Sequence, residues 1–374
     1  MFSTIRFQRN GVKPLFFFES LYQYSTTAAA FESQRYFLVD YLKNSLGFSK
    51  AEAHSLVNKI PHRKSCRKDP NLVFNFLEKL GLNKNQIRSI VSVDPIVLSY
   101  DVDKTLKPKI LVFQELGLSG SDIVRVIMYY RTILCVGRSS IVRAIEYLRK
   151  LLGTDENVAK VVKKFTPLLN DSLINRVISV NVELLQRAGF SNEELNRFVI
   201  RHPRRLIRKP QWLEENLRRV ESEFGISRES KMFYRGVEVV SACTDTKINL
   251  KLNTFRSYGW SDATIYSLIR TLPSILAKSD AKIREALSFY IEVIGYTPEY
   301  MVTRPFLFTL SLERRVKPRI EVVKILNEKK LSKKKLSFYT AVCKSEMQFV
   351  NVYILPYKDK LPDLYDSYVK SAGR

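Results

Sequence analysis

The sequence predicts an all-α fold built as a helical-repeat solenoid, and three periodic features support this prediction. Glycine recurs every 34 to 36 residues at eight positions. A residue that can cap a helix N-terminus follows each of these glycines by two positions, and proline stands fourteen residues after five of them. A constant period of this length indicates one structural unit copied along the chain. We therefore expect one continuous array of about eight repeats rather than several domains.

Each glycine is predicted to close one helix, and the next helix begins two residues later. Glycine adopts the left-handed conformation that ends many helices without steric strain. The polar side chain that follows can accept hydrogen bonds from the free N–H groups of a first helical turn. The glycines are Gly47, Gly81, Gly117, Gly153, Gly189, Gly225, Gly259 and Gly295. The predicted capping residues are Ser49, Asn83, Ser119, Asp155, Ser191, Ser227, Ser261 and Thr297.

The first helix of a repeat is clearest between Ser191 and Pro203. Leu195, Phe198 and Val199 recur with the spacing of one apolar helix face, and Pro203 stops the helix because it lacks an N–H group. The sixth repeat departs from this pattern, since polar residues occupy its apolar positions. The stop recurs at Pro61, Pro95, Pro167 and Pro273, is replaced by Arg131 and Val239, and is shifted to Pro305 in the last repeat.

A short turn and a second helix complete each repeat. A leucine three residues past the proline position predicts a turn with an apolar anchor. Leu106, Ile110 and Phe113 then show the spacing of a second amphipathic helix. Neither helix can bury its apolar face alone, so stacked repeats must supply the core. The anchoring leucines are Leu98, Leu134, Leu206 and Leu276.

These repeats resemble the mitochondrial transcription termination factor (mTERF) family, in its plant-type organellar form. The resemblance covers roughly residues 35–365. It implies two α-helices and a short 3₁₀ turn per repeat, and a curved superhelix with a basic groove for nucleic acid. Tetratricopeptide and pentatricopeptide repeats have similar periods, but their spacings of tryptophan and of glycine and proline differ from those found here. The resembling segments are residues 116–119, 188–191, 95–98, 203–206, 273–276 and 314–319.

The N-terminal segment has the composition of an organellar transit peptide. Residues 1–30 contain three basic residues, many hydroxyl residues and only Glu19 as an acid. We therefore expect a transit peptide at 1–30, a repeat array at 31–326 and a C-terminal helical cap at 327–374. The scattered arginines favour import into the mitochondrion, with the plastid as the alternative. The sequence contains no apolar run long enough to span a membrane.

The charge balance predicts a polyanionic partner. The 374-residue chain carries a net charge of +25, and residues 1–30 account for only three basic residues and one acidic residue. Many of the remaining bases follow a proline, which would align them on one surface of stacked repeats, where they could follow phosphates. The candidate nucleic-acid-binding residues are Arg63, Lys64, Arg67, Lys68, Arg131, Arg201, Arg204, Arg205, Arg208, Lys209, Arg314, Arg315, Lys317 and Arg319.

Catalytic and metal-dependent functions find little support in the sequence. The glycines occur singly, and the four cysteines are too far apart for a Cys-x-x-Cys metal site. We expect no enzyme activity, no metal and no cofactor. By resemblance, the expected function is transcription termination or regulation by a monomer bound to double-stranded DNA. RNA binding in intron splicing or RNA maturation is one alternative, and a helical protein–protein scaffold is the other.

Overall fold

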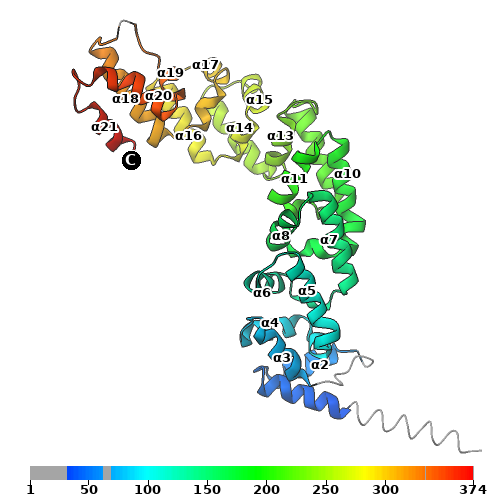
Figure 1. Ribbon diagram of the computed structural model, residues 1–374. Helices are drawn as coiled ribbons and strands as arrows, with labels where there is room; N and C mark the ends of the chain where they lie inside the picture. Colours follow the sequence, from blue (N-terminus) through cyan, green and yellow to red (C-terminus); the bar gives the residue numbers. More distant parts are fainter. Residues whose placement is uncertain (1–31, 62–68, 333, 374) are drawn as a thin grey trace, which may run out of the picture. The chain divides into compact units, whose positions relative to one another are not determined.

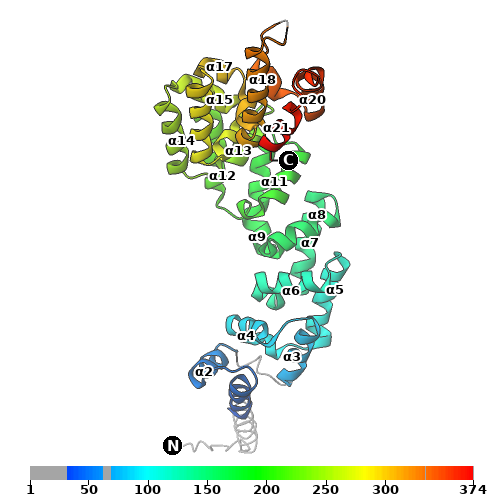
Figure 2. The same ribbon diagram turned by 90° about the vertical axis from the view of Figure 1, so that its left-hand side faces the viewer.

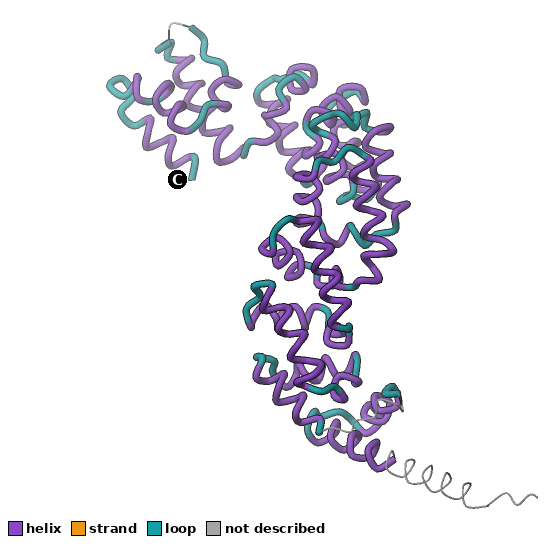
Figure 3. The backbone as a smooth tube through the Cα atoms, turned by 45° about the vertical axis from the view of Figure 1, so that its right-hand side comes forward, coloured by secondary structure: helices purple, strands orange, loops and turns teal. Residues whose placement is uncertain are grey.

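The computed structural model describes residues 32–61, 69–332 and 334–373. In these ranges all regular secondary structure is helical, and Figure 3 shows no strand. The predicted all-α helical-repeat fold is therefore confirmed. Among the described helices, none has both the length and the hydropathy needed to cross a bilayer. The predicted transit peptide at residues 1–30 lies outside the described residues.

The described chain forms two compact units. The first contains the residues up to Glu183 together with Asn192–Arg208, and the second contains Leu184–Ser191 and Lys209 onward. In the first unit a helix over residues 32–44 precedes the repeats. The first helices of its repeats are α2 (Lys50–Asn58), α4 (Lys84–Val93), α6 (Gly120–Tyr129), α8 (Asp155–Lys164) and α11 (Asn192–Arg201). The second helices are α3 (Pro70–Lys79), α5 (Lys107–Glu115), α7 (Arg138–Leu152), the short α9 (Asp171–Leu173) and α10 (Ser179–Arg187), whose last turn belongs to the second unit.

Equivalent helices of neighbouring repeats stack on one another in the first unit. Helix α8 packs between α6 and α11 (Figure 1), and α7 packs between α5 and α9. The two helices of each repeat thus belong to separate layers, with the apolar core between them. In α6 the predicted face of Ile123, Val126 and Ile127 is completely buried. Stacking of repeats supplies the core, as the pattern of the sequence requires.

The second unit continues the same alternation and ends in additional helices. Helix α14 stacks on α16, and α15 stacks on α17. The C-terminal helices α19, α20 and α21 form an apolar cluster with α18, which includes Phe349 and Tyr368. Figure 2 shows α20 and α21 beside α18. The elements are α12 (Pro210–Arg218), α13 (Phe233–Val240), α14 (Asp245–Ser257), α15 (Asp262–Thr271), α16 (Asp280–Ser288), α17 (Pro298–Val302), α18 (Lys317–Glu328), α19 (Phe338–Cys343), α20 (Glu346–Tyr353) and α21 (Leu364–Ser371).

The helix boundaries follow the predicted glycine and proline positions. All eight periodic glycines have φ between 65° and 98°, the left-handed region that favours glycine. A short 3₁₀ turn also follows the first helix in six of the repeats, as the resemblance implies, but not in the sixth, where α13 ends in an irregular turn. These 3₁₀ turns are Pro95–Ser99, Arg131–Cys135, Thr166–Leu169, Pro203–Arg205, Pro273–Ala277 and Pro305–Thr309. Within the described ranges, five short π-helical segments lie next to second helices: Val102–Leu106, Ile174–Ile178, Arg219–Glu223, Phe289–Val293 and Leu312–Val316.

Most predicted capping residues are confirmed, with corrections in the fourth repeat and in the sixth, where Met232 rather than Ser227 precedes helix α13 and no side chain caps it. In the fourth repeat Thr154, not Asp155, caps α8, and its hydroxyl accepts from the Asn157 N–H at 3.2 Å. Asp155 is already helical, and its carboxylate pairs with Arg149 at 2.5 Å. The bond with Arg149 is the main cause that holds the pKa of Asp155 below its usual value. The confirmed caps are Ser49, Asn83, Ser119, Ser261 and Thr297.

The sixth repeat keeps its glycine but begins its first helix late. Helix α13 starts at Phe233, eight residues after Gly225, and buries Phe233, Val237 and Val240. A Cβ atom at Gly236 would lie 2.8 Å from Val220, so only glycine allows the helix to pack this closely. The apolar face has therefore moved along the sequence, which explains why polar residues occupy the expected positions.

Candidate nucleic-acid interface

The structure describes ten of the fourteen candidate residues. Arg131, Arg201, Arg204, Arg205 and Arg208 belong to the first unit. Lys209, Arg314, Arg315, Lys317 and Arg319 belong to the second unit. The cluster Arg63, Lys64, Arg67 and Lys68 lies outside the described residues. A single interface through all three clusters therefore stays a prediction.

Three consecutive repeats place Tyr129, Phe165 and Arg204 side by side, and we call this group the Arg204 ladder. The Arg204 Nη2 atom donates to the Tyr129 hydroxyl at 2.8 Å. The guanidinium carbon lies 5.8 Å from the ring centre of Tyr129 and 5.8 Å from that of Phe165. The two rings meet edge to face at 6.0 Å. Arg204 is thus held by a hydroxyl and two aromatic rings rather than by an acidic side chain.

The ladder forms because its members occupy corresponding ends of stacked first helices. Tyr129 is the last residue of α6, and Phe165 follows the last residue of α8. Arg204 lies in the 3₁₀ turn that follows α11. Helix α8 packs against both α6 and α11, so the ends of the three helices come together. Phe165 is buried, whereas Arg204 is exposed and 41% of Tyr129 is exposed.

Further basic side chains lie at these helix ends. Arg131 begins the turn after α6 and is exposed, and Arg201 is the exposed last residue of α11. Arg205 is half-buried, with its guanidinium 5.7 Å from the ring centre of Phe198. Lys164 donates to the carbonyl oxygens of Ile200 and Arg201, at 3.2 Å and 2.5 Å. Cations are favoured at the C-terminal end of a helix, so this edge of the first unit concentrates positive charge.

The basic cluster after Pro305 has a different environment. Only 1% of Arg319 is exposed. Its Nη1 atom donates to the carbonyl oxygens of Ala341 and Lys344 at 3.2 Å and 2.5 Å, and its Nη2 atom pairs with Glu346 at 2.7 Å. A guanidinium buried in this way cannot reach a phosphate. Arg319 is therefore a structural residue of the second unit, and we remove it from the candidate contacts.

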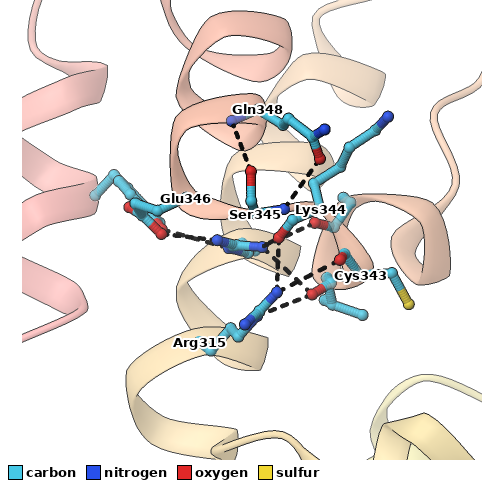
Figure 4. Close-up of polar contacts among 10 residues, drawn as sticks. Arg315, Cys343, Lys344, Ser345, Glu346 and Gln348 are labelled. Carbon is cyan, nitrogen blue, oxygen red and sulfur yellow. Dashed lines mark hydrogen bonds and ion pairs between the residues drawn. The ribbon is translucent and has the colours of Figure 1, made fainter.

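Arg315 has a similar structural role. Its Nε atom donates to the Val342 carbonyl oxygen at 3.0 Å, and Nη2 donates to that of Lys344 at 2.6 Å (Figure 4). Burial, and then the like charge of Arg319, lower the pKa of Arg315. We remove Arg315 from the candidate contacts as well. Lys317 is half-buried in an ion pair with Glu313, while Arg314 and Lys209 are exposed.

Neither a metal centre nor a disulfide is visible in the described part of the chain. No group of three or more His, Cys, Asp or Glu side chains there is placed to hold a metal ion. Cys135, Cys243 and Cys343 are free and half-buried. The chemistry that the described side chains offer at the Arg204 ladder is that of cations and exposed aromatic surface.

The fold and this edge define a helical-repeat protein with an arginine-rich surface. The sequence model of the mTERF family matches residues 31–224 and 169–350. These two matches together cover most of the chain. The chain therefore belongs to the mTERF family, and the resemblance seen in the repeats is confirmed.

Curated relatives come from Arabidopsis thaliana and are named as transcription termination factors. Chloroplastic MTERF8 is 24% identical over 71% of this chain and 52% of its own length. Mitochondrial MTEF18 is 22% identical over 73% of this chain and 46% of its own length. Mitochondrial MTERF15 is 21% identical over 66% of this chain and 55% of its own length. The matched part thus spans about half the length of these relatives. Their names include both organelles.

Sequence reasoning missed most of the Arg204 ladder. Tyr129 and Phe165 occupy the same position in the repeat, twelve residues after Gly117 and Gly153. An aromatic residue at a helical position is usually part of a core, so its identity alone does not suggest a surface role. The useful signal is the shared position, because it places both rings at the same edge of the stacked repeats, beside Arg204 of the repeat that follows them.

Proposed function

We propose that this protein binds organellar nucleic acid and regulates gene expression there, with transcription termination or regulation on double-stranded DNA as the preferred role. The names of the curated relatives support the process. The Arg204 ladder is the observation that carries the proposal. It holds an exposed guanidinium on a defined edge of the first unit, close to further basic residues.

The physical argument rests on how arginine meets phosphate. A guanidinium can donate two parallel hydrogen bonds to one phosphate, and the release of counterions makes each such contact favourable at low salt. Tyr129 and Phe165 restrict the Arg204 side chain before any ligand arrives, so less conformational entropy is lost on binding. Because its partner is a neutral hydroxyl, Arg204 does not have to break an ion pair to bind phosphate.

Two alternatives remain from the sequence and predict different measurements. RNA binding in splicing or RNA maturation uses the same phosphate contacts, so it shares the salt dependence but prefers single-stranded or RNA probes. A protein scaffold with an apolar groove is less sensitive to salt. Parallel titrations with duplex DNA and RNA at several salt concentrations therefore distinguish the three roles.

The decisive variant replaces Arg204, Arg205 and Arg208 with alanine together. We expect weaker binding to many sequences alike, because phosphate contacts carry no direct sequence information. The slope of log K against log salt should flatten by about 0.9 for each lost duplex contact, or by about 0.7 on a single strand. Fluorescence anisotropy with labelled probes measures both quantities.

A control removes the same charge elsewhere. Lys329, Lys334 and Lys335 are exposed in the second unit. Their replacement with alanine should change the salt slope less than the arginine variant does. Equal effects from the two triple variants would show that only the total charge matters and would refute a defined interface.

The remaining organisation follows from the same proposal. Residues 1–30 act as a transit peptide, residues 31–326 form the repeat array and residues 327–374 form its cap. The protein acts as a monomer, without enzyme activity, and the mitochondrion is the preferred location. The organelle that imports a fluorescent fusion carrying residues 1–30 would decide between the mitochondrion and the plastid, since relatives are named for both.

A further inference from the structure

Three buried side chains donate to the turn of the following repeat, always from the same distance along the sequence. In each pair the donor precedes its acceptor by 25 residues. The donor lies in the second-helix layer of one repeat, and the acceptor is the backbone carbonyl of the leucine three residues past the proline position of the next. The donors are at most 8% exposed. The pairs are Lys109 with Leu134, Asn181 with Leu206, and Lys251 with Leu276.

The three donors, two lysines and an asparagine, differ in side chain and charge, and what they have in common is the hydrogen bond to the turn carbonyl. A buried lysine is costly, and desolvation lowers the pKa of Lys109. Asn181 is completely buried, and its Oδ1 atom has no hydrogen-bond partner. An amide with an unsatisfied oxygen contributes only through its two N–H donors. Lysine and asparagine thus perform one task at the same position of different repeats.

Asn181 differs from the two lysines because it binds its turn at two points. Its Nδ2 atom donates to the carbonyl oxygens of Leu206 and Arg208, both at 2.8 Å. Arg204 and Arg205 directly precede the first acceptor, Leu206, and Arg208 is itself the second acceptor. We call the segment 203–208 the basic turn. We propose that Asn181 is a positioning residue for nucleic-acid binding, which fixes the backbone that carries Arg204, Arg205 and Arg208.

This role rests on the proposed function and adds a residue that does not touch the ligand. Two hydrogen bonds to one short segment restrict its peptide planes. The arginine side chains of the turn are therefore attached to a backbone of fixed conformation, so less conformational entropy is lost when they bind phosphate. The effect of Asn181 on affinity must pass through the arginines of the turn. It should disappear when those arginines are absent.

A double-mutant cycle tests this dependence. Asn181→Leu has nearly the same size but donates no hydrogen bond. In the otherwise native chain we expect a loss of affinity for duplex DNA of about fivefold or more, since one or two ordered hydrogen bonds are removed. In the variant that lacks Arg204, Arg205 and Arg208, the same substitution should change affinity by less than about twofold.

Rescue by lysine separates positioning from general stability. Lys109 and Lys251 make one equivalent bond from the equivalent position. Asn181→Lys should therefore recover the bond to Leu206 and restore part of the affinity that Asn181→Leu loses. Asn216 provides the matched control because it is also a buried asparagine, and it donates to Trp212 within its own helix at 2.7 Å. Asn216→Leu should lower the melting temperature, but its effect on DNA affinity should be the same with and without Arg204, Arg205 and Arg208.

The possible outcomes are distinct. A triple arginine variant that binds like the native chain overturns the proposed function and the positioning role together. If the triple arginine variant binds more weakly and Asn181→Leu still lowers its affinity by the same factor as in the native chain, the positioning role alone is overturned. If Asn181→Leu does not fold, Asn181→Ala is measured in the same cycle. An equal loss in both backgrounds then again contradicts the proposal.

Discussion

The basic clusters after Pro203 and after Pro305 have the same kind of sequence and different structures. Arg204 is exposed and rests against the side chains of Tyr129 and Phe165. Arg319 is buried and bound to backbone carbonyls and to Glu346. A run of bases at one position in a repeat therefore does not define one role. The surroundings of the turn decide whether an arginine is available to a ligand.

The difference arises from the helices that pack against the second cluster. Helix α18 is packed against α19 and α21, helices of the predicted cap, and α19 ends at Cys343. The last carbonyl groups of a helix have no partner within it, so they need donors from elsewhere. Arg315 and Arg319 supply those donors. Backbone patterns thus transfer from repeat to repeat, while the role of a charge does not.

The largest effect should come from Arg319→Met. This substitution removes a buried guanidinium. Glu346 loses its ion pair but keeps the hydrogen bonds from the Tyr368 hydroxyl, and the carbonyl groups of Ala341 and Lys344 lose the hydrogen bonds from Arg319. A hydrogen bond to a charged group contributes about 1.5–3 kcal/mol, and Arg319 makes several, so the unfolding free energy should fall by about 3 kcal/mol or more. The ion pair adds less than a fully buried one, because 40% of the Glu346 side chain is exposed. Chemical denaturation, followed by circular dichroism, measures this change. Nucleic-acid affinity per folded molecule should stay the same, because Arg319 cannot reach a ligand.

Arg314→Met is the matched control for this comparison. Arg314 belongs to the same basic cluster but is exposed. Its replacement should change the unfolding free energy by no more than about 0.5 kcal/mol. If both variants unfolded alike, the buried network around Arg319 would have no special structural role.

A smaller effect is expected at the glycines, where all repeats behave alike. Gly189 has φ of 93°, and a Cβ atom there would lie 3.6 Å from the Arg228 carbonyl oxygen. Gly189→Val should cost about 1–3 kcal/mol, because a branched side chain is strained in this conformation. Thermal melting measures the loss.

Gly120 supplies the contrast within the same class of residue. It is the first residue of α6, its φ is not positive, and a Cβ atom would meet nothing within 4 Å. Gly120→Ala should therefore stabilise the protein by about 0.4–1 kcal/mol. Similar destabilisation at both positions would contradict the assignment of Gly189 as a conformational requirement.

The sequence was most informative about the backbone. Glycine at φ above zero and proline after a helix act through steric constraints of the residue itself, so their positions predicted helix ends in repeat after repeat. Asp155 shows the limit of such rules, because Thr154 is equally able to cap and lies one residue earlier. The choice between two neighbouring caps depends on tertiary packing, which the pattern does not contain.

The candidate site was less predictable because its roles depend on neighbours from other repeats. Nothing within residues 314–319 shows that α19 will bring its carbonyl groups to Arg319. Buried donors such as Asn181 were also missed, since a polar residue in an amphipathic helix is normally assigned to the surface. Its separation of 25 residues from the turn leucine is the signal that could have revealed it.

The smallest effect apart from the control variants, and the sharpest test of the Arg204 ladder, is expected for Tyr129→Phe. The substitution removes the hydroxyl that accepts from Arg204 but keeps the ring. One hydrogen bond contributes about 0.5–1.5 kcal/mol, so affinity for duplex DNA should fall by roughly two- to tenfold. The melting temperature should hardly change, because the hydroxyl is on an exposed side chain. Anisotropy titrations at constant salt measure the loss.

The salt dependence of this variant distinguishes orientation from charge. Tyr129→Phe leaves every positive charge in place, so the number of phosphate contacts and the slope of log K against log salt should stay close to those of the native chain. The triple arginine variant, in contrast, should flatten that slope. If Tyr129→Phe binds as tightly as the native chain at every salt concentration, the hydroxyl does not position Arg204 for binding. The exposed cluster would then act only through its charge. Arg204 and Arg319 would in that case differ only in that Arg204 is exposed and Arg319 is buried.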